Sequence, residues 1–358
     1  MTLYFTTSDN ADFLYASKFI VHDPVFLLVN SPQQPKIYVS ELEFGRAQKE
    51  SCCEVFLREK GFKDHEYALK ITEDITDLKV NYNFPAGLFK KIQEQRQIDV
   101  IESCIQEREI KTEQEVQHLI NANKISMKCF DKIKNILSES TIQGEFIIYN
   151  NTKLTSETLR IEVKKVILEN GGISDYEPII ACGVQGCDPH CIGTGNIIPN
   201  QAIVCDIFPR ADTLYYADMT RTFVKGKPSN VLKKQYEKVL EVQQHAIQMV
   251  KPGMRILDIA KYVEDAFAKD GYKKELIDDQ WCGMIHGLGH GVGLDLHEAP
   301  SVNTRVAEDK VCIINQVFTI EPGLYYHKVG GVRIEDDIRV TEHGVEVITP
   351  YSYDWIIK

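Results

Sequence analysis

The feature that most constrains the fold is the segment HGLGHGVGLDLHEAP, residues 286–300, in which glycine occupies every second position from Gly287 to Gly293. Three histidines, at 286, 290 and 297, share this stretch. A packed strand is expected to tolerate four glycines poorly, because each leaves side-chain volume unfilled and costs backbone entropy. Glycine does suit a backbone that passes very close to another group. The segment therefore predicts a binding cleft.

The length and charge of the chain narrow its functional class. Its 358 residues, 43% hydrophobic and 26% charged, are typical of a globular protein of about two domains. A net charge of −11 argues against a general binder of nucleic acid or anionic membrane, whose surface would be basic. The opening residues lack the pattern of a signal peptide, and no apolar stretch has the length of a membrane span. We therefore expect a cytoplasmic protein, with its ten cysteines reduced.

Hydrophobic patterns predict two domains, residues 1–110 and 111–358. The first resembles a small α/β unit, with strand-like runs at 25–29 and 36–39 and helix-like runs at 41–50 and 86–98. Thr112 and Glu115 have capping-box spacing at the start of a long helix. Two further helices are expected at about 229–250 and 256–269, within a larger α+β domain.

A cysteine cluster, CGVQGCDPHC, suggests a second kind of metal site. It places Cys182, Cys187, His190 and Cys191 within ten residues. The spacing matches no familiar zinc pattern, and no second CxxC pair occurs elsewhere to complete a tetrahedral shell. We therefore favour cysteines that pack as small apolar side chains over a zinc or iron–sulfur site.

The stretch IVCDIFPRADTLYYADMTRTF, residues 203–223, predicts a β-hairpin with a turn at 209–212. Asp206 shares a strand face with Phe208, and Asp218 shares one with Thr220. A carboxylate among apolar neighbours is costly to bury unless a positive group meets it. From the hairpin alone, the simpler alternative is that both faces are solvated.

Two more carboxylates favour a metal site over solvated faces. FTIEPGLYY places Glu321 after an apolar strand, and GGVRIEDDIRVT places Glu335 inside another, on the same side as Arg333. Separate strand-like runs thus each carry a carboxylate that needs a cation. Four carboxylates and one neutral imidazole would balance two divalent ions, and oxygen-rich ligands favour an ion such as Mn²⁺.

In chain order, DIFPR…DMTRTF, HGLGHGVGLDLHEAP, TIEPGLY and GVRIEDDIRVT resemble the pita-bread metallopeptidases of the aminopeptidase P and prolidase type. The likeness runs from about residue 110 to the end, and the first hundred residues resemble the creatinase-type amino-terminal domain of that branch. The resemblance implies an α+β fold, in which a pita-bread catalytic domain follows a smaller creatinase-type α/β domain.

The resemblance also implies the roles of individual residues. Asp218 and Glu335 would bridge two divalent ions, most simply Mn²⁺, with Co²⁺, Fe²⁺ and Zn²⁺ left open. The remaining metal ligands would be Asp206, His290 and Glu321. Glu321 would also act as general base on a water whose pKa the ions lower from about 16 towards about 7. His297 and His190 would act on the scissile carbonyl, His286 would bind substrate, and Arg333 would orient a ligand carboxylate.

The implied activity is hydrolysis of the bond before proline in peptides with proline at the second position, as in an Xaa-Pro aminopeptidase. Two alternatives remain: an Xaa-Pro dipeptidase (prolidase), and a pita-bread binding scaffold without catalysis. We expect no nucleic-acid or membrane partner, and a homodimer is an open alternative.

The chain departs from the family pattern at three places. The spacing from Asp206 to Asp218 is one residue longer than usual, which leaves Asp212 as a rival ligand. Phe208 stands where the family usually has glycine. Ser301 follows HEAP where relatives acting on dipeptides often carry arginine, although Arg305 is close by.

Overall fold

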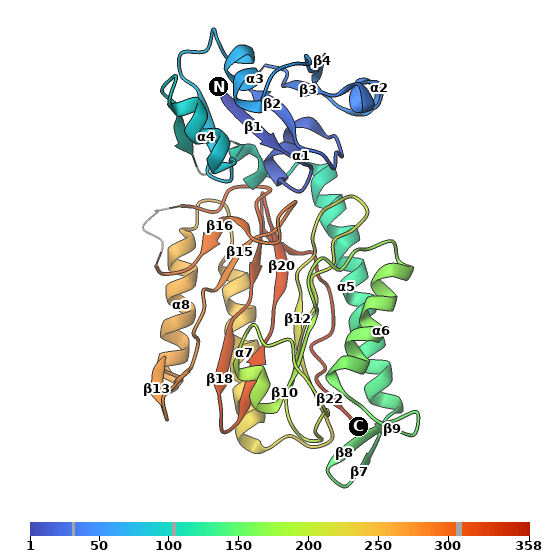
Figure 1. Cartoon of the computed structure of the whole chain (residues 1–358). Helices are drawn as coiled ribbons and strands as arrows, with labels where there is room; N and C mark the ends of the chain where they lie inside the picture. Colours follow the sequence, from blue (N-terminus) through green and yellow to red (C-terminus); the bar gives the residue numbers. More distant parts are fainter. Residues whose placement is uncertain (31–32, 102–104, 306–309) are drawn as a thin grey trace. The chain divides into compact units, whose positions relative to one another are not determined.

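The computed structural model describes residues 1–30, 33–101, 105–305 and 310–358, and Figure 1 shows its course. The chain divides into two compact units, Met1–Arg108 and Glu109–Lys358. Within the described residues, no helix combines the length and the hydrophobicity that a membrane-spanning segment requires.

In the described part of the first unit, six strands form one mixed sheet in the order β4-β3-β2-β1-β5-β6. The strands are β1 (Thr2–Thr6), β2 (Val25–Val29), β3 (Lys36–Val39), β4 (Glu54–Leu57), β5 (Lys79–Asn81) and β6 (Asp99–Ile101). The helices are α1 (Ala11–Ser17), α2 (Glu41–Glu50), α3 (Asp64–Ile71) and α4 (Ala86–Gln93). The predicted strands at 25–29 and 36–39 and the helix at 41–50 are confirmed.

The helix predicted over 86–98 is too long, because α4 ends at Gln93. Ile98 is buried, which explains the helical pattern, but it reaches the core from the extended segment before β6. Arg96 donates a hydrogen bond of 2.5 Å to the carbonyl of Thr72, so the chain after the helix is anchored to a neighbouring turn.

The second unit begins with the predicted long helix, α5 (Glu113–Glu139). Its capping box is confirmed: Glu115 N–H donates to Thr112 Oγ1, and Thr112 N–H donates to a carboxylate oxygen of Glu115. The other helices are α6 (Ser156–Glu169), α7 (Asn230–Met249) and α8 (Ile256–Lys269). The last two confirm the ranges predicted from the sequence, and Ser229 caps α7 by accepting from the N–H of Leu232.

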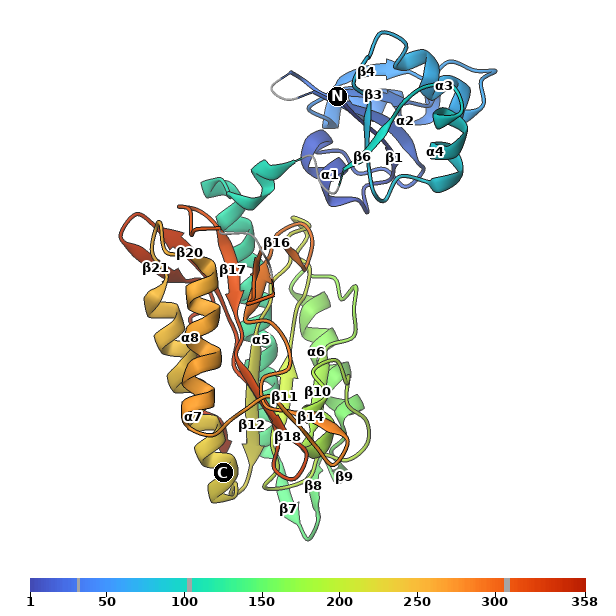
Figure 2. The same cartoon turned by 90° about the vertical axis from the view of Figure 1, so that its left-hand side faces the viewer.

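Strands of the second unit lie between two helix pairs, α5 with α6 and α7 with α8 (Figures 1 and 2). One sheet has the order β10-β11-β12-β22 and a second has the order β16-β15-β17-β20-β21, with β18 and β19 forming a hairpin. An apolar core underlies each helix pair. The strands are β10 (Ile179–Cys182), β11 (Ile203–Asp206), β12 (Thr220–Lys225), β15 (Gly289–Gly291), β16 (Glu298–Val302), β17 (Val317–Ile320), β18 (Gly323–Tyr326), β19 (Gly330–Arg333), β20 (Asp336–Thr341), β21 (Gly344–Val347) and β22 (Ile356–Ile357). Smaller pairings join β7 (Thr141–Gln143), β8 (Phe146–Tyr149) and β9 (Thr152–Lys153), and β13 (Glu275–Ile277) with β14 (Gln280–Cys282).

The predicted hairpin at 203–223 is confirmed, since β11 and β12 pair antiparallel with Asp206 opposite Thr220. Its connection is longer than the predicted turn and runs from 207 to 219. The reason is that the backbone of Arg210 pairs with Ile173 and with Tyr216, so the connection satisfies its peptide groups away from the ladder.

The glycine-rich segment contains the short strand β15, which includes two of the four glycines, Gly289 and Gly291, and leaves Gly287 and Gly293 outside it. The close approach that glycine permits is present. A Cβ atom on Gly289 would collide with the carbonyl of Thr319 in β17, and one on Gly291 would collide with the carbonyl of Ala299 in β16. Neighbouring backbone therefore fills the space that side chains would otherwise take.

The cysteines of the CGVQGCDPHC cluster pack as small apolar side chains, as favoured from the sequence. Cys182 and Cys187 are buried, and Cys182 belongs to the apolar core beneath α5 and α6. In the described part of the chain, the groups of ligand atoms close enough to hold one ion do not include these cysteines.

Candidate functional site

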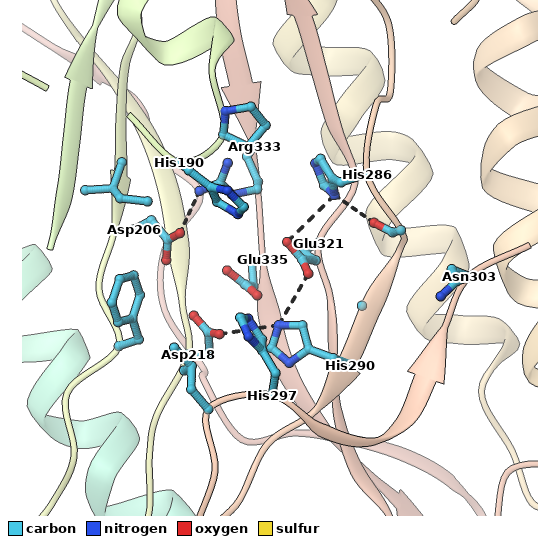
Figure 3. A pocket seen from close by; sticks show the side chains of 16 residues that line it. His190, Asp206, Asp218, His286, His290, His297, Asn303, Glu321, Arg333 and Glu335 are labelled. Atoms are coloured by element: carbon cyan, nitrogen blue, oxygen red, sulfur yellow. Dashed lines mark hydrogen bonds and ion pairs between the residues drawn. The ribbon is translucent and has the colours of Figure 1, made fainter. Parts of the chain in front are cut away.

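The side chains proposed as metal ligands come from several strands and converge at one point of the second unit, where they face one another (Figure 3). Each lies at a strand or at a strand end. Asp206 ends β11, Asp218 precedes β12, His290 lies in β15, Glu321 follows β17, and Glu335 stands between β19 and β20.

These five side chains form two groups of ligand atoms, each with three atoms within 4.8 Å of one another, and a third such group joins Asp218 and His290 to His297. One group joins His290, Glu321 and Glu335, and the other joins Asp206, Asp218 and Glu335. His290 Nε2 lies 3.5 Å from Glu321 Oε1 and 3.6 Å from Asp218 Oδ2. Glu335 therefore belongs to both groups, as a ligand shared by two ions would.

His290 is oriented by its backbone surroundings. Its Nδ1 lies 3.1 Å from the carbonyl of Gly291, which can only accept, so Nδ1 carries the proton. The Nε2 atom is then a free acceptor directed at the carboxylates, which is the form in which histidine binds metal. Its backbone N–H also donates to Thr319 Oγ1 at 3.1 Å, which fixes the strand that carries the ring.

The electrostatics of this cluster are those of an acidic site that needs a cation. Burial and the charge of Glu335 raise the pKa of Asp218 well above its usual range. Burial and the charges of Glu321 and Asp206 do the same for Glu335. Burial raises the pKa of Glu321 to about 8, with Asp206 among the charges that add to it. A bound cation would relieve this repulsion by stabilising the ionised carboxylates.

A second, independent observation indicates that these side chains fit a metal ion. Asp206 Oδ1 is buried and accepts no hydrogen bond from any described residue. A buried polar atom without a partner is costly in a native structure, so it needs an ion or an ordered water. Together with the two ligand groups, this oxygen supports binding of a hard or intermediate divalent ion.

Arg333 is almost fully buried and holds the acidic cluster in place. Its Nη2 donates to Asp206 Oδ2 at 2.6 Å, its Nε donates to Thr220 Oγ1 at 3.2 Å, and its Nη1 donates to the hydroxyl of Tyr325 at 3.0 Å. Thr220 in turn donates to Glu335 Oε2 at 2.7 Å. One guanidinium thus fixes the positions of two carboxylates, directly and through a threonine.

His286 lies at the opposite side of the cluster from Asp206 in Figure 3. Its Nδ1 is 2.7 Å from the carbonyl of Gly287, so Nδ1 carries the proton and Nε2 accepts from the Tyr325 hydroxyl at 2.8 Å. Burial lowers its pKa to about 3, and the nearby Arg333 adds to this effect. His286 is therefore neutral near pH 7.

The remaining predicted histidines also line the cavity. His190 and His297 are exposed, and the ring of His297 stands edge-on to that of His290 with centroids 4.2 Å apart. The cavity has a volume of about 300 Å³ and brings all nine predicted site residues together. The rival ligand Asp212 is exposed in the connection and does not line it.

Sequence reasoning missed four polar residues that support the site. Thr220 and Tyr325 bind Arg333, whereas Asp337 accepts from the N–H of Asp218 at 3.2 Å and from Asn123 Nδ2 at 2.8 Å. A signal existed for two of them. Asn123 interrupts the apolar face of α5, and Thr220 lies on the same strand face as Asp218.

Comparison with known proteins identifies the family of the chain. Residues 117–342 match the model of metallopeptidase family M24. The chain is 30% identical to the Xaa-Pro dipeptidase of Pyrococcus horikoshii over 321 residues, covering 87% of this chain and 83% of that protein. It is also 30% identical to the Xaa-Pro dipeptidase of Pyrococcus furiosus over 318 residues, covering 87% and 84%.

Solved structures give the same result at the level of the fold. The prolidase from Pyrococcus horikoshii OT3 superposes with a TM-score of 0.83 at 28% identity, covering 99% of this chain and 95% of that one. The X-Pro aminopeptidase from Thermotoga maritima superposes with a TM-score of 0.80 at 24% identity, covering 99% and 97%. The predicted α+β pita-bread fold is confirmed, and the chain belongs to metallopeptidase family M24.

Proposed function

We propose that this metallopeptidase is an Xaa-Pro aminopeptidase, which releases the first residue from peptides that have proline at the second position. In this proposal residues 111–358 form the catalytic domain and residues 1–110 the amino-terminal domain. The charge of the cavity wall is the observation that favours a longer peptide over a dipeptide as the substrate.

A dipeptide brings its terminal carboxylate into the cleft, and that charge needs a positive partner. Among the described residues that line the cavity, Arg333 is the one with a permanent positive charge, and its three nitrogens already bind Asp206, Thr220 and Tyr325. His286 is neutral near pH 7, because its pKa is lowered to about 3.

The sequence positions 301–309, directly after the HEAP segment, provide no other positive partner for the carboxylate of a dipeptide. Ser301 and Arg305 are exposed and do not line the cavity, and Arg305 is directed towards the carbonyl of Ile285 at 3.5 Å. Residues 306–309 contain no lysine or arginine. A longer peptide carries an uncharged amide at the equivalent point and avoids the unpaired carboxylate.

The names of the relatives support cleavage before proline, and they also favour the second candidate, an Xaa-Pro dipeptidase, because both Pyrococcus relatives carry that name. A bond to proline nitrogen lacks the N–H that most peptidases bind and has a restricted φ angle, so it requires a dedicated cleft.

In the proposed mechanism, Asp206, Asp218, His290, Glu321 and Glu335 hold two divalent ions, for which Mn²⁺ suits the oxygen-rich set. When bound, such ions supply Lewis-acid activation of water and of the scissile carbonyl. Glu321 accepts the proton of the attacking water at a carboxylate oxygen and delivers it to the proline nitrogen.

The histidines act on the substrate in this proposal. His190 and His297 donate hydrogen bonds to the scissile carbonyl oxygen as negative charge develops there. His286 binds the part of the peptide that follows proline. Arg333 holds the carboxylates of Asp206 and Glu335 in position to bind the metal ions.

The test compares Ala-Pro with Ala-Pro-Ala as substrates of the Mn²⁺-loaded full-length protein. We expect kcat/KM to be at least about tenfold higher for the tripeptide, since the dipeptide leaves its carboxylate without a partner. Faster cleavage of Ala-Pro would favour the dipeptidase. Cleavage of neither peptide, with retained peptide binding, would favour the non-catalytic scaffold.

A further inference from the structure

Phe208 is the side chain that most distinguishes this cavity from the family pattern, in which glycine usually stands two residues after the first aspartate. Phe208 is partly buried and lines the same cavity as Asp206 and Asp218. A glycine there would leave open space, whereas the phenyl ring gives the wall an apolar surface.

The ring of Phe208 is held in position by an aromatic support. Tyr176 contacts it edge-on, with ring centroids 6.4 Å apart and an interplanar angle of 61°. Tyr176 also contacts Tyr216 at 6.5 Å, and the Tyr216 hydroxyl donates to Asp175 Oδ2 at 2.6 Å. The longer connection between β11 and β12 supplies Phe208 and Tyr216, so the extra residue in this chain accompanies a built aromatic wall.

Tyr216 is in turn tied to the glycine-rich segment. Its backbone N–H donates to the carbonyl of Gly293 at 2.8 Å, and its side chain is buried. Arg210 lies over its ring, 5.4 Å from the centroid. Tyr216 is therefore anchored through its backbone and its side chain, and Tyr176, which is 58% exposed, connects it to Phe208.

Two further apolar side chains, Ile179 and Leu296, line the same cavity as Phe208. Ile179 stands directly opposite Asp206 in the pairing of β10 with β11. Phe208 and Ile179 therefore place apolar surface beside Asp206, where it can exclude water from a bound side chain.

The charge distribution decides which part of the peptide lies at that side. The amino end of the substrate is its positively charged end, and a side that carries Asp206 and Asp218 suits it better than it suits the negatively charged carboxyl end. His286 and Asn303 lie on the other side in Figure 3 and give that side an uncharged polar wall.

We propose that Phe208, Ile179 and Leu296 form an apolar subsite that receives the side chain of the first substrate residue, and that Phe208 selects peptides with a large apolar residue before proline. This proposal rests on the proposed function, because it concerns the same cleft and the same bond. Phe208 acts by contact with the substrate side chain and has no part in proton transfer.

The experiment measures kcat and KM for Gly-Pro-Ala, Ala-Pro-Ala, Leu-Pro-Ala and Phe-Pro-Ala with the Mn²⁺-loaded protein. We expect the wild type to prefer Leu-Pro-Ala over Gly-Pro-Ala by roughly tenfold or more in kcat/KM. Phe208→Gly, which restores the usual family residue, should reduce this ratio roughly tenfold, mainly through KM.

Further variants keep the test decisive if Phe208→Gly folds poorly. Phe208→Leu should retain most of the preference, and Ile179→Ala should weaken it in the same direction as Phe208→Gly. The matched control is Leu168→Ala, because Leu168 is 70% exposed on α6 and does not line the cavity. This control should leave the ratio unchanged.

Each outcome separates the two proposals. If the wild type cleaves none of the four peptides, the proposed function fails. If it cleaves them but Phe208→Gly and Ile179→Ala keep the wild-type ratio, the subsite is wrong and the proposed function stands. An increased preference for Leu-Pro-Ala in Phe208→Gly would show that the ring obstructs large side chains, and it would also overturn the subsite.

Discussion

The Nζ atom of Lys111 lies 2.6 Å from Oε1 of Glu298, and only 2% and 8% of the two side chains are exposed. Lys111 directly precedes the residue that caps α5, and Glu298 directly follows His297. This buried ion pair therefore links the start of the long helix to the segment that carries a cavity histidine.

Lys111→Met should lower the free energy of unfolding by about 3–5 kcal/mol, because it leaves the buried carboxylate of Glu298 without this cation. The double variant Lys111→Met/Glu298→Leu should recover part of that loss. Urea denaturation followed by tryptophan fluorescence and circular dichroism measures both. The control is Lys328→Met, because the side chains of its ion pair with Asp278 are 81% and 73% exposed and solvent screens their attraction, so this variant should keep nearly the wild-type stability. Equal losses in the two lysine variants would refute the prediction.

Glu335→Gln should abolish binding of both ions, because Glu335 belongs to both ligand groups and the amide carries no charge. The side chain keeps its size, so the fold should survive. Metal content after dialysis against Mn²⁺, measured by mass spectrometry, gives the result directly. Asp212→Asn removes an exposed carboxylate outside the cavity and should keep the wild-type content. Unchanged stoichiometry in Glu335→Gln would contradict the shared-ligand interpretation.

The stability of the metal-free protein should depend on pH through Glu321. Burial raises the pKa of this carboxyl from 4.5 to about 8, so the folded state holds a proton that the unfolded state releases. This group therefore destabilises the fold progressively as pH rises from 4.5 to 8. Burial lowers the pKa of His286 and His290 from 6.5 to about 3. The contribution of these two groups to the stability of the fold therefore rises with pH, and the rise is complete by about pH 6.5.

Burial also raises the pKa of Asp218 and Glu335, so the contribution of Glu321 is isolated by comparison with Glu321→Gln. Between about pH 6.5 and pH 8, metal-free wild type should lose up to about 2 kcal/mol relative to Glu321→Gln. Chemical denaturation in the presence of a chelator measures this difference. Saturating Mn²⁺ should remove the dependence, because a cation stabilises the ionised carboxylate. A difference between the two proteins that stays constant with pH would be inconsistent with the raised pKa.

Tyr325→Phe should lower kcat/KM roughly tenfold while the protein remains folded. The lost hydroxyl accepts from Arg333 and donates to His286, so both side chains lose a partner that orients them. The neighbouring Tyr326→Phe is the control, because that hydroxyl makes one long contact of 3.5 Å with the carbonyl of Lys273. Steady-state kinetics and thermal melting distinguish them, and equal kinetics in both variants would argue against a positioning role.

Gly289→Ala should destabilise the second unit by more than about 2 kcal/mol, because the added methyl group collides with the carbonyl of Thr319. Gly87→Ala provides the opposite case. Gly87 lies in α4 with open space around it, so alanine there should stabilise the protein by up to about 1 kcal/mol. Thermal melting of the two variants should move in opposite directions, and a downward shift of similar size in both would refute the close-approach argument.

Local chemistry explains why much of the framework was predictable. The capping box of Thr112 and Glu115 and the periodic apolar faces of α7 and α8 are patterns within a few residues of one another. Carboxylates such as Glu321 and Glu335 stood out because an ionised group beside an apolar strand must meet a positive charge.

What the sequence alone determined is therefore the set of elements and the identity of the groups that need a cation, since both follow from local periodicity and from the cost of burying charge. The tertiary structure decided the partners: Tyr325 on Arg333, Asn123 on Asp337 and Lys111 on Glu298. Members of these pairs stand from 8 to 214 residues apart in the chain, and their contacts depend on how strands and helices pack, which no local pattern encodes.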